Sequence, residues 1–418
     1  MLMNKIEKAN KEAVNRMIQS QPVLKGIKRA GDVLDGLDKH VIYHAGPPIE
    51  WEDMCGPLRG AVIGAMKYEG WVDDEDEAVK LIEAGEITFD SNHHHNAVGP
   101  MTGIISQSMP VFEVENTRYG NVAYSTINEG IGKVMRFGAN GPEVLNRLHW
   151  LEDEFAPVMD KVIEKTGGVN LKNVISKALA MGDEMHQRNI AASLIFYKEV
   201  CGELAEVLRD YDNDREIVEF IIKKNDQFFL NLAMAAGKAI MDSVRGIEYS
   251  TVVTAMSRNG TDFGINVSGL DGEWYTAPVK KADGLFFPGY SEEDANLDIG
   301  DSTILECIGI GGFAKGSAPA VVNFIGAGSV DKAVEYSKDM GKITVDRNSD
   351  LAMPNMNFLG AASGIDIRKV VDRRILPVIN TGIAHKEAGV GQVGAGIVNP
   401  PVDIFEKALI DYAEKYNL

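Results

Sequence analysis

The chain has 418 residues, of which 45% are hydrophobic and 25% charged, and its formal net charge is −19 at pH 7. This composition is typical of a globular protein with a substantial core, and the negative charge argues against nucleic acid or an anionic membrane as a partner. Three scattered cysteines, no long apolar run and no signal-peptide stretch predict a reduced, cytoplasmic protein without a membrane span.

Residues 1–140 are predicted to form an α/β domain. The N-terminal stretch is charged and has helical periodicity. HVIYHAGPPI (40–49) and MPVFEVEN (109–116) indicate short strands, whereas EDEAVKLIEAG (75–85) indicates a helix that ends at a glycine.

Residues 141–245 are predicted to form a helical domain. No proline occurs between Pro157 and Pro278, and glycine is sparse in the same region. Apolar residues recur at spacings of three and four from Val144 to Val162, which indicates one helical face. Further helices are predicted at 171–181, 184–209, 213–224 and 226–244, so a strand within 171–244 would contradict this domain.

Residues 246–418 are predicted to form a second α/β domain. Two β-branched runs around Asn259-Gly260 indicate a hairpin. STILECIGIGG (302–312) is interpreted as a buried strand, and the segments 329–341 and 401–416 as helices. The predicted fold class is therefore α/β (α+β) and multidomain, with mixed α/β segments at both ends flanking a central all-helical domain.

Two glycine motifs were weighed as binding loops. The G-x-G-x-x-G motif at 389–394 is rejected as a dinucleotide site, because two prolines follow where a crossover helix would be needed. In the segment 309–326 the backbone N–H groups of Gly311 and Gly312 could face an anion. Tight packing explains this segment equally well, and Lys315 precedes Gly316 rather than following it, unlike in a P-loop.

The segment SNHHHNAVGPMTG (91–103) places three histidines in a row. In an extended loop, neighbouring side chains point to opposite sides. His93 and His95 are therefore expected to face one ligand, while His94 packs in the interior. A metal site would need a third protein ligand, which Asp183 or His186 could supply. Asparagines rather than carboxylates flank the run, which favours a substrate or anion over a metal.

Further polar residues lie among glycines and other small residues. A helix start is predicted in MGDEMHQRNIAAS (181–193). It would place Asp183 and His186 at i, i+3 and Glu184 and Arg188 at i, i+4. Arg188 and Arg59 are expected to point into one cleft and bind anionic groups. The further candidates, segment by segment, are Glu52 and Asp53; Glu129, Lys133 and Arg136; Arg258, Asn259 and Asp262; and Asn380, His385 and Lys386.

The chain resembles the YlbE/YahG-like family over nearly its whole length, from about residue 40 to 400. The matching motifs, in chain order, are HAGPPI, GPLRGA, DSNHHHNAVGPMTG, NEGIGKVMRFGAN, GDEMHQRNIAAS, NGTDFGI, DANLDIGDS, GIGGFA and PVINTGIAHKEAGVGQVGAGIV. One family member is a subunit of oxamate carbamoyltransferase. The resemblance implies the reaction of oxalurate with phosphate to give oxamate and carbamoyl phosphate, as a step of allantoin degradation, and partner subunits that include an acyl-CoA-synthetase-like protein.

Carbamoyl transfer needs cations for phosphate and carboxylate, donors for an oxyanion and a group that moves a proton. The predicted catalytic residues are His93, His95, His186 and Asp183. The predicted substrate-binding residues are Arg59, Arg188, Arg258, Asn259, Lys315, Gly311, Gly312, His385 and Asn380. No Ser-His-Asp or Cys-His constellation is evident in the sequence, so direct transfer without a covalent intermediate is expected, with no metal and no cofactor.

Three functional classes remain open at this point. The first is a carbamoyltransferase subunit that carries the site and binds a small anionic substrate. The second is a metal-dependent hydrolase that uses the histidines, and the third is a non-catalytic scaffold of the same complex. The family resemblance predicts a homo-oligomer or a need for partner subunits.

Overall fold

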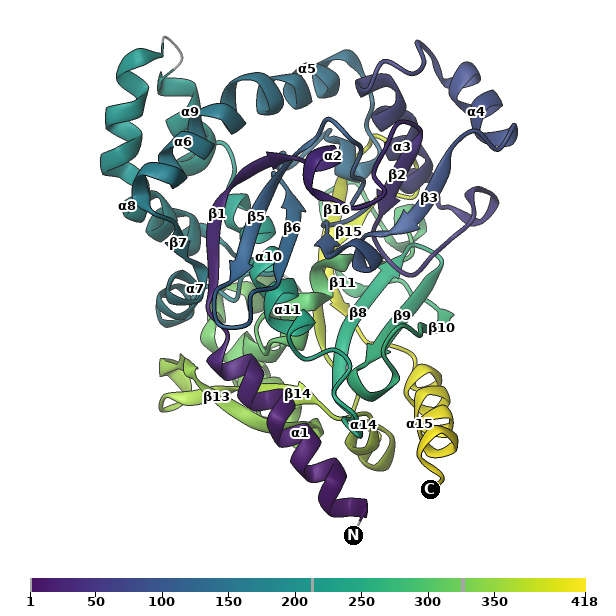
Figure 1. The fold of residues 1–418 in the computed structure, drawn as a ribbon. Coiled ribbons are helices and arrows are strands. Elements are labelled where there is room, and N and C mark those ends of the chain that lie inside the picture. Colours follow the sequence, from purple (N-terminus) through teal and green to yellow (C-terminus); the bar gives the residue numbers. More distant parts are fainter. Residues whose placement is uncertain (1, 212–213, 325–327) are drawn as a thin grey trace.

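The computed structural model describes residues 2–211, 214–324 and 328–418 and has a mixed α/β fold with several small sheets (Figure 1). The largest sheet has the strand order β4-β6-β5-β1-β7. Its strands are β1 (Pro22–Arg29), β4 (Ala97–Val98), β5 (Pro110–Asn116), β6 (Val122–Thr126) and β7 (Val169–Asn170). Strand β5 pairs antiparallel with β1 and with β6. Successive residues of each strand face opposite sides of the sheet.

The C-terminal half contributes a four-stranded and a three-stranded sheet. The orders are β10-β9-β8-β12 and β11-β16-β15, and the neighbouring strands are antiparallel. The strands are β8 (Val253–Asn259), β9 (Asp262–Val267), β10 (Tyr275–Pro278), β11 (Asp283–Phe286), β12 (Ile299–Gly300), β15 (Ile379–Ala384) and β16 (Gln392–Val398). The predicted hairpin around Asn259-Gly260 is confirmed as β8 and β9.

Two smaller sheets complete the strands. The parallel pair consists of β2 (Val41–His44) and β3 (Thr88–Ser91), and the antiparallel pair of β13 (Thr344–Met353) and β14 (Leu359–Ile365). Around the sheets lie α1 (Leu2–Gln19), α2 (Ala30–Val33), α3 (Gly56–Tyr68), α4 (Glu75–Glu83), α12 (Pro319–Phe324), α13 (Val330–Ile343), α14 (Ile367–Arg373) and α15 (Val402–Tyr416). Figure 1 shows α1 beside β13 and β14.

The middle of the chain is helical, as predicted. It contains α5 (Pro142–Trp150), α6 (Ala156–Thr166), α7 (Leu171–Ala180), α8 (Ile190–Val207), α9 (Asp214–Ile222) and α10 (Phe228–Asp242), and within 171–211 and 214–244 the structure describes no strand. A π-helical segment, Leu151–Phe155, joins α5 to α6, just before Pro157, which has no N–H to donate. The division of the chain into three domains stays a prediction.

Helix α10 is apolar on nearly all of its faces, which is the pattern of a buried helix. It packs against β5 and β6 of the largest sheet and against α11 (Ile304–Cys307). One hydrophobic core extends from Ile6 near the N-terminus to Tyr412 near the C-terminus. Among the described residues, no helix combines the length and apolar character that a membrane span requires.

The interpretation of 302–312 as a buried strand is wrong. This segment forms a 3-10 turn, the short helix α11 and the start of a second 3-10 segment, Gly311–Ser317. A helix rises about 1.5 Å per residue and a strand about 3.3 Å. The helical turn therefore brings Ser302 close enough to Glu306 for both side chains to reach one imidazole ring, which an extended strand would prevent.

Candidate functional site

The loop between α7 and α8 carries the first part of the site. The Glu184 carboxylate accepts hydrogen bonds from the backbone N–H groups of His186, Gln187 and Arg188. Asp183 accepts another from Ala192 at 2.9 Å. Because these carboxylates bind the backbone donors, the predicted helix 184–209 instead begins at Ile190.

Two expected helical pairs in this loop are therefore also wrong. Arg188 forms its ion pair with Asp183, at 3.0 Å, rather than with the Glu184 carboxylate. His186 does not share a helical face with Asp183. It turns into the interior, where its side chain is 3% exposed.

His186 lies between a serine and a carboxylate. Its Nδ1 atom is 2.8 Å from Glu306 Oε1, and its Nε2 atom is 2.8 Å from Ser302 Oγ. Ser302 and Glu306 are themselves buried, with exposed fractions of 5% and 0%. A carboxylate on Nδ1 and a hydroxyl on Nε2 is the arrangement found in serine-histidine-acid catalytic triads.

Asn380 at the start of β15 holds the two glutamates together. Its Nδ2 atom donates to Glu184 at 2.9 Å, and its backbone N–H donates to Glu306 at 3.3 Å. Burial raises the pKa of Glu184, and the charge of His186 and these hydrogen bonds oppose that rise. The predicted site residues Asn380 and His186 are thus brought together, although they come from distant parts of the chain.

Gly311 and Gly312 serve this cluster instead of presenting free N–H groups to a ligand. Gly311 N–H donates to the carbonyl of Glu184, and Gly312 N–H donates to Glu306 Oε1 at 2.7 Å. Gly311 has a φ of +61°, and a Cβ atom there would lie 2.2 Å from Glu306 Oε1. Gly312 therefore binds a protein carboxylate and Gly311 a backbone carbonyl, and the positive φ and close approach at Gly311 require glycine.

Lys315 is a buried cation beside the same glutamates. Its side-chain amine has no hydrogen-bond partner and lies 4.5 Å from the centre of the Tyr336 ring. Burial lowers the pKa of Lys315 to about 7, against the opposing effect of Glu184 and Glu306. At neutral pH this amine can therefore both take up and release a proton.

A pocket opens beside His186 and Ser302. Its empty volume is about 290 Å³, and its walls include Arg136, Gln227, Gly382 and Gln392. Gln227 and Gln392 also line a larger hollow of about 910 Å³, whose walls include Arg188 and Asn189. The two hollows therefore adjoin each other at these side chains.

Arg136 is the cation of the smaller pocket. Its guanidinium donates to the carbonyl of Gly130 and, at 3.0 Å, to Gln227 Oε1. Burial lowers the pKa of Arg136 to about 10, so the group stays charged at neutral pH. Glu129 accepts hydrogen bonds from the backbone N–H groups of Met135 and Arg136 and so fixes this turn.

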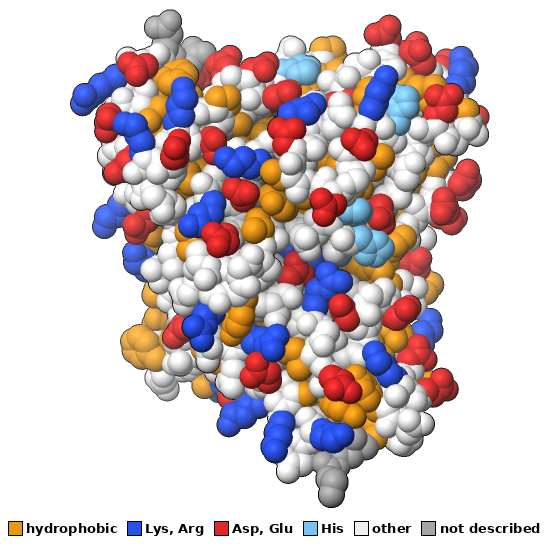
Figure 2. Space-filling view, in the orientation of Figure 1, with side chains coloured by type: hydrophobic (Ala, Val, Ile, Leu, Met, Phe, Trp, Pro, Cys, Tyr) orange, Lys and Arg blue, Asp and Glu red, His pale blue; other side chains and the backbone are white. Residues whose placement is uncertain are grey.

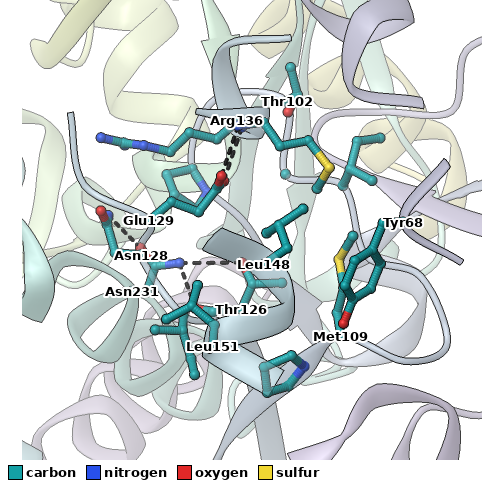
Figure 3. Close-up of a pocket in the computed structure, with 16 residues that line it drawn as sticks. Tyr68, Thr102, Met109, Thr126, Asn128, Glu129, Arg136, Leu148, Leu151 and Asn231 are labelled. Carbon is teal, nitrogen blue, oxygen red and sulfur yellow. Dashed lines mark hydrogen bonds between the residues drawn. The ribbon is translucent and has the colours of Figure 1, made fainter. Parts of the chain in front are cut away.

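A third cavity lies on the other side of Arg136 (Figure 3). Tyr68, Met109, Leu148 and Leu151 give it mostly apolar walls, and the Arg136 side chain extends away from Tyr68 and Met109. Its polar groups are largely paired, for example Asn128 with Asn231 at 2.8 Å. We place the chemistry at the His186 pocket, because titratable groups converge there.

Several buried polar atoms in the His186 cluster and the adjoining loop have no hydrogen-bond partner. They are Gln187 Oε1, Glu306 Oε2, Lys315 Nζ, Asn380 Oδ1 and both amide atoms of Asn189. Similar atoms occur elsewhere among the described residues, for example at His93 and Thr254. Of the residues in the cluster, Gln187 lines the pocket, so its Oε1 atom is an acceptor for a bound polar molecule.

The three consecutive histidines do not act together as expected. They lie in a 3-10 turn, Asn92–His95, rather than in an extended loop, so His93 turns into the interior whereas His94 and His95 both reach Asp90. His93 is buried, and its Nε2 atom lies 3.5 Å from Asp301 Oδ1. His94, predicted to be interior, is 38% exposed and binds Asp90, and His95 binds the other oxygen of Asp90 while stacking on Tyr43.

Burial lowers the pKa of His93 well below its ordinary value, and the charges of Lys238 and Arg245 lower it further. The ring is therefore neutral. Asp301, which faces it, accepts hydrogen bonds from Ser257, Asn92 and two backbone N–H groups. His93 thus belongs to a buried network that is separate from the His186 pocket.

Arg258 lies directly beneath the site but does not face the pocket. It donates to Asp298 at 2.7 Å, to the carbonyl of Gly300, and to the hydroxyl groups of Thr303 and Thr381. These two threonines follow Ser302 and Asn380 in the sequence. Arg258 therefore supports the segments that carry the site.

Three other predicted site residues bind backbone groups outside the His186 pocket. Asn259 accepts hydrogen bonds from the backbone of its own turn and donates to the carbonyl of Pro47. Arg59 donates to the backbone carbonyl of Glu52 and lies 5.2 Å from the Trp51 ring centre, and it is not among the residues that line the hollow of Arg188. His385 accepts from the backbone of Glu387.

Ser302, Glu306 and Gln227 were not predicted as site residues, and Glu184 was expected only at i, i+4 spacing from Arg188. One signal was present. A glutamate within the apolar run STILECIGIGG must find partners when the run is buried. Ser302 and Gln227 carry no comparable signal, because neither residue type marks a site by itself.

The chain is similar to known proteins over its whole length. A family model described as oxamate carbamoyltransferase subunit AllG matches residues 87–302. Two curated proteins of Escherichia coli (strain K12) align over 100% of the chain. They are oxamate carbamoyltransferase subunit AllG, 45% identical over 100% of its own length, and uncharacterized protein YahG, 46% identical over 88% of its own length. A crystal structure of a conserved protein of unknown function from Enterococcus faecalis V583 is 42% identical, with a TM-score of 0.97 over 99% of both chains.

Proposed function

Because the chain belongs to the family of oxamate carbamoyltransferase subunit AllG, we propose that it is a carbamoyltransferase subunit and that its pocket at His186 binds the substrate. The proposed substrate is a small ureido acid of the oxalurate type. Phosphorolysis would convert oxalurate and phosphate into oxamate and carbamoyl phosphate.

The observation that carries this proposal is the convergence of Arg136, His186 and Ser302 on one pocket of about 290 Å³. The buried guanidinium of Arg136 matches the carboxylate of a ureido acid. His186 and Lys315 are the groups able to move a proton in this cluster.

Phosphate, the second substrate, would enter through the larger hollow. Arg188 lines that hollow and is 35% exposed. It can therefore meet an anion before the anion reaches the smaller pocket. We also propose that the protein works with partner subunits, one of them acyl-CoA-synthetase-like, and that it is a homo-oligomer.

The test is reconstitution of the complex from the products of neighbouring genes. Phosphorolysis of a series of small ureido acids is then followed by the formation of carbamoyl phosphate. His186→Asn should abolish turnover while complex assembly persists, as seen by size-exclusion chromatography. His40→Asn is the matched control, because His40 packs on Trp71 outside the pocket. Full activity of the His186→Asn complex would instead make this chain a scaffold.

A further inference from the structure

The hydroxyl group of the buried Ser302 has an imidazole as its partner. Ser268 and Ser317 donate to backbone carbonyls, and Ser257 donates to a carboxylate. Ser302 Oγ instead lies 2.8 Å from His186 Nε2, and both residues line the pocket. The Ser302 hydroxyl is therefore placed where a bound substrate and a base can both reach it.

The tautomer of His186 follows from its second partner. An ionised carboxylate can only accept, so the proton lies on Nδ1 and is donated to Glu306. Nε2 then carries the lone pair and accepts the Ser302 hydroxyl proton. Glu306 is itself held by Gly312 N–H, which keeps the imidazole oriented.

We propose that Ser302 is a catalytic nucleophile that takes up the carbamoyl group as a covalent carbamoyl-serine, with His186 as its base and Glu306 as the residue that positions His186. This proposal rests on the proposed carbamoyl transfer and replaces the expected direct transfer. It adds a second chemical step and assigns the substrate's carbamoyl carbon to a position beside Ser302 Oγ.

The two half-reactions balance without a further reactant. In the first, Ser302 Oγ attacks the carbamoyl carbon of oxalurate and the C–N bond to the oxamate nitrogen breaks. His186 takes the hydroxyl proton and gives it to that nitrogen, so oxamate leaves. In the second, a phosphate oxygen attacks the carbamoyl-serine, carbamoyl phosphate leaves, and the phosphate proton returns through His186 to Ser302 Oγ.

The pocket also contains a donor for the oxygen that becomes negative in each step. Gln227 lines the pocket, and its Oε1 accepts from Arg136. This hydrogen bond leaves the Nε2 amide protons of Gln227 as donors for an oxyanion. The neighbouring charge of Arg136 strengthens the same effect.

The first experiment uses the assembled complex with oxalurate and isotopically labelled oxamate, in the absence of phosphate. A carbamoyl-serine makes the first half-reaction reversible, so label should pass into oxalurate. After acid quenching, mass spectrometry should find one added carbamoyl group on the peptide that contains Ser302. Ser302→Ala should lose the exchange and the adduct and lower turnover at least about a thousandfold, whereas Ser268→Ala should retain all three.

A second experiment separates this proposal from the proposed function. A fluorophosphonate probe should label Ser302 in the full-length protein and fail to label it in His186→Asn. If Ser302 is labelled but no ureido acid is turned over, the nucleophile stands and the proposed function fails. If oxalurate is turned over without exchange, adduct or labelling, or if Ser302→Ala remains active, the covalent mechanism is overturned.

Discussion

Glu306 Oε1 lies 2.8 Å from Nδ1 of His186, although 120 positions separate the two residues along the chain. The Glu306 carboxylate contacts His186 Nδ1 and accepts hydrogen bonds from the backbone N–H groups of Gly312 and Asn380. It also acts electrostatically on the amine of Lys315. Changing one of these groups therefore has a definite consequence for the others.

Glu306→Gln should lower turnover about a hundredfold to ten-thousandfold, because the charge that stabilises a protonated His186 is lost. The free energy of unfolding should change little, since the amide oxygen can still accept from Gly312 N–H and Asn380 N–H. Glu306→Ala should destabilise the fold by roughly 1–3 kcal/mol for each donor left unpaired. Steady-state kinetics and urea unfolding of both variants measure these effects, and equal stability of Glu306→Ala and wild type would contradict them.

Lys315 should make stability depend on pH. Its pKa is about 7 in the folded protein and 10.5 in its ordinary state, so between these values the unfolded chain binds more protons. The contribution of Lys315 to the free energy of unfolding therefore rises with pH, by roughly 1.4 kcal/mol per pH unit within this window. Lys315→Met should remove this slope in urea titrations between pH 7 and pH 10.

Lys342→Met is the matched control, because Lys342 is 53% exposed and pairs with Asp339 at the surface. Its unfolding curves should keep the pH dependence of the wild type. Identical slopes for Lys315→Met and the wild type would show that Lys315 is not a perturbed lysine.

Arg258→Lys should destabilise the protein by roughly 1–3 kcal/mol for each acceptor left unpaired, because lysine keeps the charge beside Asp298 but cannot replace all the donors to Gly300, Thr303 and Thr381. Activity should fall as well, because Arg258 supports the segments that carry Ser302 and Asn380. Arg245→Lys alters a half-exposed pair with Asp271 and should cost about 1 kcal/mol or less. Urea midpoints of the two variants compare the losses directly, and similar midpoints would argue against the supporting role of Arg258.

Arg188→Lys should raise the KM for the anionic substrate about tenfold, since the charge remains but the two-pronged guanidinium is lost. The thermal midpoint should be recorded alongside, because Arg188 also pairs with Asp183. Arg59→Lys, outside the hollow of Arg188, should leave both kcat and KM unchanged. An unaltered KM in Arg188→Lys rules out a bidentate clamp at this position.

Protein purified without a tag should contain no stoichiometric zinc, manganese or iron, and activity should survive chelation. The reason is geometric, because His94 and His95 both bind Asp90 while His93 faces Asp301. The three rings therefore do not converge on one ion. Elemental analysis with activity assays checks this expectation, and activity that is lost with a bound metal would reverse it.

The sequence predicted the elements whose pattern is local. The hairpin at Asn259-Gly260 and the helix of residues 402–416 follow from turn residues and apolar spacing. The start of α8 and the helix α11 could not be predicted in this way, because carboxylates and partners from distant segments decide them. At Glu184, for example, the side chain takes the backbone donors that a helix would otherwise use.

The site was partly predictable for the same reason. His186, Lys315 and Asn380 were identified as polar residues among glycines, and the structure brings all three to one cluster. The pairing of His186 with Glu306 depends on tertiary contacts that no local spacing encodes. The three histidines of residues 93–95 misled the prediction, because a 3-10 turn in place of an extended loop changes every side-chain direction.

Strands β15 and β16 complete the pocket. A chain that ends before residue 378 contains His186 and Glu306 but neither the amide groups of Asn380 nor the side chain of Gln392. Burying Glu184 and Glu306 with fewer donors is costly. We therefore expect a chain that is still being synthesised to close the pocket only after its last strands are available. Figure 2 shows acidic and basic side chains interspersed over one face of the folded molecule, so no broad field of a single sign covers that face.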